Sequence, residues 1–68
     1  MAQPDDLGEI LFELTYLGAA VRVAAIHAAS DREAVVMGPA SAATADLERL
    51  ALQKLKAQLA RDARPAER

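Results

Sequence analysis

Residues 9–17 are the first stretch of the chain in which the side chains follow a two-residue hydrophobic periodicity. In an extended strand, side chains alternate between two faces. One face would carry only apolar side chains: Ile10, Phe12, Leu14 and Tyr16. The other face would mix charged, polar and aliphatic side chains: Glu9, Leu11, Glu13, Thr15 and Leu17. A second alternating stretch follows at residues 19–29, so we predict two strands.

A turn centred on Leu17 and Gly18 would join these strands into an antiparallel hairpin. This turn sets a register in which apolar side chains face one another. The apolar pairs are Leu14 with Val21, Phe12 with Val23 and Ile10 with Ala25. On the reverse face the same register places Glu13 opposite Arg22, as a cross-strand ion pair.

A second turn is expected at residues 29–32, where Asp31 tolerates the left-handed conformation of a three-residue hairpin loop. A third strand then covers residues 33–38 and stops at Pro39, which has no N–H to donate. This loop length brings Val35 and Met37 onto the face of Val23. A slip of one residue would bring Val36 there instead, and the sequence leaves both registers open.

Residues 41–62 carry the three- and four-residue spacing of an amphipathic helix. The apolar repeat consists of Leu47, Leu50, Leu52, Leu55 and Leu59. Ser41 is the expected N-cap, since its hydroxyl can accept from a first-turn N–H. Acidic residues early in the helix and basic residues late in it suit the helix dipole.

The apolar stripe of this helix is wider than one contact surface requires. Its early leucines point in one direction, whereas Leu52, Leu55 and Leu59 lie about 100° further around the axis. One interpretation is that the first half covers the chain's own sheet and the second half meets another surface. The alternative is that Leu52 is simply an exposed leucine.

The predicted fold class is α+β: a three-stranded antiparallel meander followed by one C-terminal helix packed on one sheet face, in the order βββα. We expect a flexible lead-in at residues 1–8, a single domain at 9–62 and a mobile tail at 63–68. The helix would lie across seven strand residues: Ile10, Phe12, Leu14, Val21, Val23, Val35 and Met37.

One helix cannot cover both faces of such a sheet, which leaves apolar area for a homodimer or another protein. The candidate interface residues are Leu52, Leu55, Leu59, Leu11 and Ile26. Composition supports this expectation. A chain of 68 residues without cysteine has no disulfide to stabilise its small core, so oligomerisation is the remaining means. We therefore predict a small homo-oligomeric structural or adaptor module that binds protein.

The alternative function is a nucleic-acid-associated accessory protein that uses the basic half of the helix. The basic positions are Arg49, Lys54, Lys56, Arg61 and Arg64. Asp46, Glu48 and Asp62 are interleaved with them, and the formal net charge of the chain is −2. These charges make nucleic acid the weaker interpretation.

Candidate chemistry is sparse. His27, Ser30 and Asp31 have the residue types of a catalytic triad, but one exposed turn would lack an oxyanion hole and a pocket. Capping explains Ser41 without a bound anion, because the glycine spacing of a phosphate loop is absent. We expect no enzyme activity, no cofactor and no metal site.

Neither a signal peptide nor a transit peptide is expected at the N-terminus, where Asp5 and Asp6 precede any apolar run. The longest apolar stretch, residues 17–29, contains Arg22 and His27 and is too short to span a bilayer. The sequence therefore predicts a soluble, cytoplasmic protein with no membrane partner.

Three segments together carry a resemblance to a known family: residues 10–28 with Gly18 at the turn, Val35 to Ser41, and Leu47 to Leu55. Over residues 9–60 the chain resembles a family of short bacterial proteins of unknown function. The resemblance implies the meander-and-helix fold. It implies no activity, cofactor or site residue.

Overall fold

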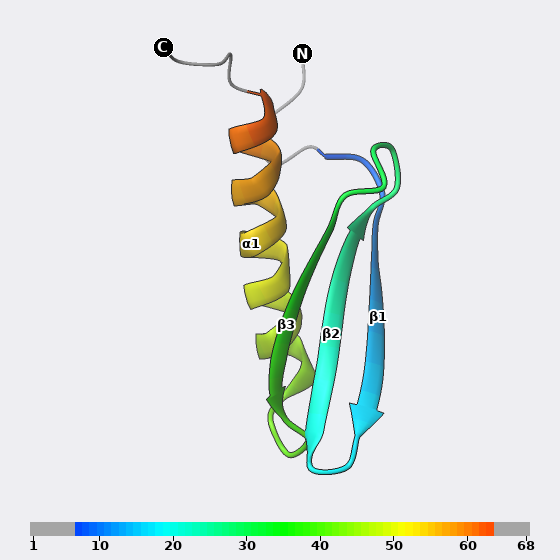
Figure 1. Ribbon diagram of the computed structural model, residues 1–68, viewed down its shortest axis with the longest axis vertical. Helices are drawn as coiled ribbons and strands as arrows, with labels where there is room; N and C mark the ends of the chain where they lie inside the picture. Colours follow the sequence, from blue (N-terminus) through cyan, green and yellow to red (C-terminus); the bar gives the residue numbers. More distant parts are fainter. Residues whose placement is uncertain (1–6, 64–68) are drawn as a thin grey trace.

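The computed structural model describes residues 7–63 and, for side chains, residues 7–62. Three strands and one helix follow in order: β1 at Ile10–Leu17, β2 at Ala20–His27, β3 at Glu33–Pro39 and α1 at Thr44–Ala63. The sheet is antiparallel with strand order β1-β2-β3 (Figure 1). This arrangement confirms the predicted α+β meander with one C-terminal helix. The expected lead-in and tail fall outside the described residues, apart from Leu7, Gly8 and the backbone of Ala63.

The first turn lies one residue later than expected. Gly18 and Ala19 connect β1 to β2, and Gly18 has a φ of 61°, as the first central residue of a type II′ turn does. Moving the turn centre by one residue moves the register by two, so Leu14 lies opposite Val23 rather than Val21. Because the shift is even, each side chain keeps its predicted face.

The predicted ion pair between Glu13 and Arg22 is a consequence of that register and is wrong. Glu13 lies opposite Ala24, and Arg22 lies opposite Thr15. The Arg22 guanidinium instead donates to the Glu33 carboxylate on β3, at 3.4 Å. Both side chains are partly exposed, so this ion pair stabilises the sheet only slightly.

The second turn has four residues between its closing pair rather than three. The His27 N–H donates to the Arg32 carbonyl at 2.8 Å, and Asp31 has a φ of 63°. The left-handed conformation of Asp31 is therefore confirmed. The longer loop changes which β3 residues face the core, and it places Val36 opposite Val23. Of the two registers that the sequence left open, the one with Val36 on the face of Val23 is therefore correct.

With this register, the expectation that Val35 and Met37 join the core face is wrong. Val35 lies opposite Ala24 and Met37 opposite Arg22, both on the reverse face of the sheet. An odd change in loop length moves every side chain of the following strand to the other face.

The helix begins three residues after Ser41, which is therefore not its N-cap. The Ala42 N–H donates to the Pro39 carbonyl at 2.9 Å and closes a turn that contains Ser41. The N–H groups of Asp46 and Leu47 both donate to the Ala43 carbonyl, at 3.1 and 3.3 Å. Ala43 thus occupies the capping position, and no side-chain oxygen there can accept from a first-turn N–H.

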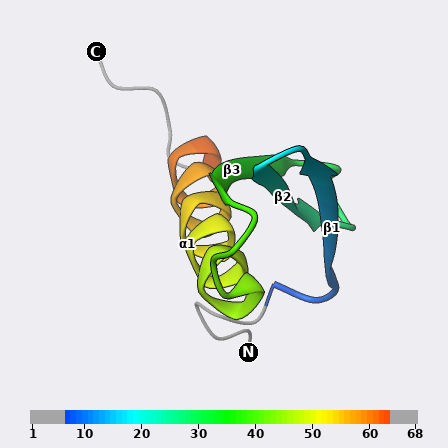
Figure 2. The same cartoon turned by 90° about the horizontal axis from the view of Figure 1, so that it is seen from below.

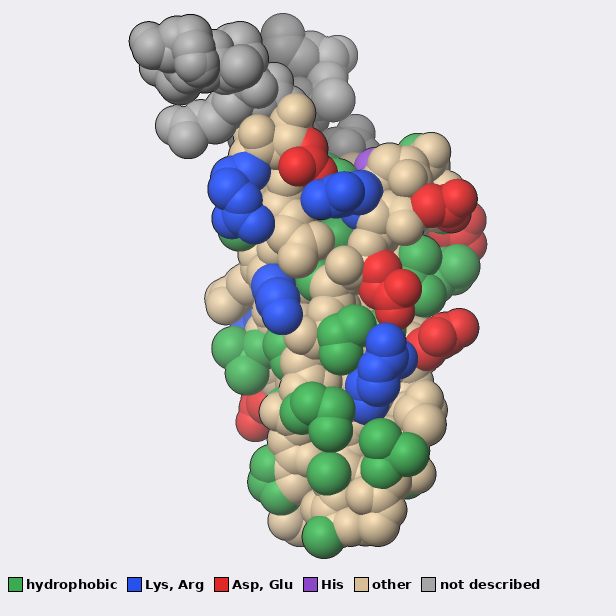
Figure 3. All heavy atoms as spheres, viewed as in Figure 1, with side chains coloured by type: hydrophobic (Ala, Val, Ile, Leu, Met, Phe, Trp, Pro, Cys, Tyr) green, Lys and Arg blue, Asp and Glu red, His purple; other side chains and the backbone are tan. Residues whose placement is uncertain are grey.

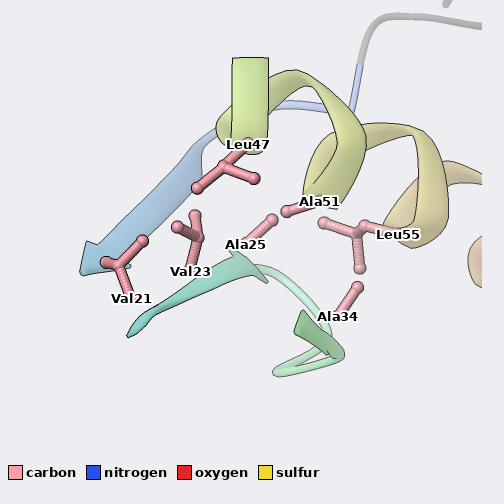
Figure 4. Close-up of a cluster of buried hydrophobic side chains, with 7 residues drawn as sticks. All are labelled: Val21, Val23, Ala25, Ala34, Leu47, Ala51 and Leu55. Carbon is pink, nitrogen blue, oxygen red and sulfur yellow. The ribbon is translucent and has the colours of Figure 1, made fainter. Parts of the chain in front are cut away.

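Small residues let the helix lie close to the sheet. The buried core consists of Val21, Val23, Ala25, Ala34, Leu47, Ala51 and Leu55. Ala51 of the helix points toward Ala25 of β2, and Leu55 points toward Ala34 of β3 (Figure 4). In β3, a Cβ on Gly38 would lie 2.8 Å from Leu47 Cδ2, so a larger residue there would require the Leu47 side chain to move.

The helix packs on β2 and β3 and leaves β1 beyond its edge (Figure 2). Its position follows from the short link at residues 40–43, which holds the first helical turn near the end of β3. A helix about 10 Å wide covers roughly two strands that are about 4.8 Å apart. The prediction that it also covers Phe12 is wrong, since that side chain is 37% exposed.

Candidate protein-binding surface on strand β1

Strand β1 holds most of the exposed large apolar side chains in the described part of the chain. These side chains are Leu11, Phe12, Tyr16 and Leu17 in β1, Met37 in β3 and Leu50 in the helix. Those of Phe12 and Tyr16 lie on the helix side of the sheet, and those of Leu11 and Leu17 on the reverse side. An apolar strip therefore runs along both faces of a single edge strand.

Within residues 7–63, no strand pairs with the outer side of β1. The Ala28 N–H donates to the Glu9 carbonyl at 3.1 Å, so Glu9 and Ala28 are a hydrogen-bonded pair and the Glu9 carbonyl points toward β2. Hydrogen-bonded and non-hydrogen-bonded pairs alternate along an antiparallel ladder. The backbone groups that point away from β2 are consequently those of the even-numbered residues: Ile10, Phe12, Leu14 and Tyr16. These groups can pair with another strand.

The opposite edge of the sheet is protected. The Lys54 Nζ donates to the outward carbonyl of Val35 at 2.8 Å, and Pro39 at the end of β3 has no N–H. Lysine and proline are common means of preventing an edge strand from pairing with another chain. Strand β1 has neither residue, and its one charged side chain is Glu13. We define the β1 edge as the outward backbone of residues 10–17 with its four exposed apolar side chains.

The structure separates the candidate interface residues of the sequence into two groups. Leu11 and Ile26 lie opposite each other on the reverse face, where Leu11 is 46% exposed. Leu55 is completely buried in the chain's own core, and Leu59 packs beside that core. Leu52 is half-buried. The core therefore uses both halves of the helix, and Leu55 is not available to a partner.

Sequence reasoning assigned Phe12 to the core and did not place Tyr16 in an interface. The exposure of one strand could have been predicted from the width of a helix, since one helix cannot cover three strands. The side of the sheet that stays open depends on the length of the link between β3 and α1. Four residues in this link place the helix over β2 and β3, so β1 is the least covered strand, although Ile10 and Leu14 still pack beside the core.

Both ring nitrogens of His27 have polar contacts. Its Nε2 donates to the Leu7 carbonyl at 2.8 Å, and its Nδ1 lies 2.6 Å from the Ser30 hydroxyl oxygen. The Ser30 hydroxyl also accepts from the Arg32 N–H at 3.3 Å. These contacts join Leu7, three residues before β1, to the β2–β3 loop. The His27 ring is held by the Leu7 carbonyl and not by Asp31, so a structural role is sufficient to explain His27.

The basic residues of the helix are interspersed with acidic ones. Arg49 pairs with Asp46 at 3.2 Å, Arg32 pairs with Asp62 at 2.8 Å, and Lys54 is bonded to β3. Figure 3 shows Lys, Arg, Asp and Glu side chains alternating over the face in view rather than forming one basic patch. Arg64 lies outside the described residues.

A family model described as Domain of unknown function (DUF6898) matches residues 7–62. The chain belongs to this family. The match includes all three strands and the helix except for its last residue. Searches of curated proteins and of solved structures found no match to the chain. The DUF6898 assignment accordingly agrees with the resemblance in the sequence and adds no activity.

Within residues 7–63 this DUF6898 chain has no pocket and no cluster of three metal-ligating side chains. The helix in the same range is not apolar enough to cross a membrane. The β1 edge of the described residues combines outward backbone groups with exposed apolar side chains.

Proposed function

We propose that this DUF6898 chain is a small homo-oligomeric structural or adaptor module that binds protein through the β1 edge. The observation that carries the proposal is the contrast between the two edges of the sheet. Lys54 and Pro39 protect the β3 edge, whereas the β1 edge combines exposed apolar side chains with backbone groups that have no strand partner among the described residues.

Strand addition suits such an edge. An added strand satisfies the outward N–H and C=O groups and covers apolar side chains on both sheet faces at the same time. A monomer would leave a long, apolar edge strand in solvent, which is the geometry that natural proteins usually avoid. Pairing also enlarges the small core, and this supports stability in a chain without cysteine.

Light scattering on two matched variants tests this function. Tyr16 and Met37 are each 56% exposed, the first on the β1 edge and the second on the reverse face of β3. We expect Tyr16→Lys to lower the solution mass to that of a monomer, because an ammonium group next to the paired strand would lose its hydration. Met37→Lys should leave the mass of the native oligomer unchanged.

Circular dichroism of both variants checks that each keeps its fold. A native chain that is monomeric at every concentration would contradict the homo-oligomeric part of the proposal. Equal loss of association in both variants would contradict the assignment of the surface to β1.

A further inference from the structure

We infer that the partner of the β1 edge is β1 of a second copy, paired antiparallel about a two-fold axis at Leu14. The inference rests on the proposed function and specifies its partner and register. It follows from the hydrogen-bonding polarity of β1 and from the order of its side chains.

Two identical strands that pair antiparallel are related by a two-fold axis perpendicular to the sheet. Residues directly opposite each other then come from the same face of each copy. The outward backbone groups belong to even-numbered residues, so the hydrogen-bonded pairs of the new ladder must join even-numbered residues. The axis therefore passes through a residue of β1, and the central candidates are Glu13, Leu14 and Thr15.

An axis at Leu14 makes the strand complementary to itself. Phe12 then lies opposite Tyr16 of the second copy, on the helix side of the sheet. On the reverse side Leu11 lies opposite Leu17, and Glu13 lies opposite Thr15. Each of the four exposed apolar side chains of β1 gains an apolar partner, and aromatic cross-strand pairs are among the more favourable ones.

The neighbouring registers lack this complementarity. An axis at Glu13 sets the two Glu13 carboxylates directly opposite each other and places Leu11 against Thr15, and like charges in that position are destabilising. An axis at Thr15 moves Phe12 opposite Gly18, beyond the end of the strand, so the ring has no partner. Charge and apolar pairing both select Leu14.

The resulting dimer has one continuous sheet with β1 of each copy at its centre and both helices on the same side. Each helix covers β2 and β3 of its own copy, so the Phe12 and Tyr16 rings form an apolar strip between the helices. Each copy contributes half of this strip. The β3 edges, which Lys54 and Pro39 protect, become the two outer edges and stop further strand addition.

Disulfide trapping between single-cysteine chains tests the register, because the native sequence has no cysteine. Glu13→Cys and Thr15→Cys both lie on the exposed reverse face, outside the core. In the Leu14 register they form a non-hydrogen-bonded pair with Cα atoms about 4.5 Å apart, within the range of a disulfide. We expect a mixture of the two variants to cross-link under mild oxidation, and neither variant alone to exceed background.

A mixture of Thr15→Cys with Met37→Cys measures that background, since Met37 lies away from the β1 edge. Cross-linking of Glu13→Cys alone, or of Thr15→Cys alone, would overturn the Leu14 register while leaving the β1 edge as the binding surface. Cross-linking of no sample above background would overturn self-pairing through β1. The light-scattering comparison of Tyr16→Lys with Met37→Lys then decides separately whether the proposed function also fails.

Discussion

At the scale of single residues, backbone conformation determines both turns. Gly18 and Asp31 have φ values of 61° and 63°, in the left-handed region that disfavours most side chains. The sequence predicts Asp31 in this role because a short polar side chain tolerates the conformation. The prediction that Ser41 is the N-cap is wrong, since a capping residue can be recognised only when the first helical turn is known. The turn that begins at Pro39 contains Ser41, so the helix begins later in the chain than expected.

Asp31→Gly should therefore stabilise the fold. Glycine removes the steric cost of the left-handed conformation, and we expect the free energy of unfolding to rise by about 0.5–1 kcal/mol. Urea denaturation measures this change. Gly18→Ala is the opposite case and should lower the free energy of unfolding, because a Cβ is introduced at a φ of 61°. A loss of stability in Asp31→Gly would mean that the aspartate side chain contributes more than its backbone conformation costs.

At the scale of elements, the sequence predicts which segments form strands and helix but not how they pair. The existence of each element follows from side-chain periodicity, which is a local property. Strand register depends on the centre and length of a turn. Because the first turn was predicted at Leu17-Gly18, one residue too early, every predicted pair of the first hairpin is wrong by two positions. For β3, the extra loop residue exchanged Val36 for Val35 on the core face.

The helix provides a matched pair of leucines for a test of this packing. Leu55 is completely buried and points toward Ala34 (Figure 4), whereas Leu52 is half-buried. We expect Leu55→Ala to lower the free energy of unfolding by about 2–5 kcal/mol, and Leu52→Ala to lower it by much less. Thermal or urea denaturation distinguishes the two. Similar losses in both variants would mean that the helix packs through a different face.

At the scale of the whole molecule, the open edge of the sheet follows from the order of the chain. The short link after β3 places the helix over β2 and β3, and β1 stays an edge strand because no later element of the described residues pairs with it. The sequence predicts leftover apolar area, since the hydrophobic residues exceed what one helix can cover. It divides that area between the distal helix and the reverse sheet face at Leu11 and Ile26. The distal helix is included because the direction of a leucine stripe does not reveal where the helix lies on its sheet.

Amide hydrogen exchange across a range of chain concentrations tests the central claim, that the β1 edge is a strand-pairing surface. Within one copy, the N–H groups of Leu11, Glu13 and Thr15 point toward β2, whereas those of Phe12, Leu14 and Tyr16 point outward. We predict that exchange at Phe12, Leu14 and Tyr16 slows as concentration rises, while exchange at the three inward amides stays slow throughout. Fast exchange of the outward amides at every concentration would contradict the account.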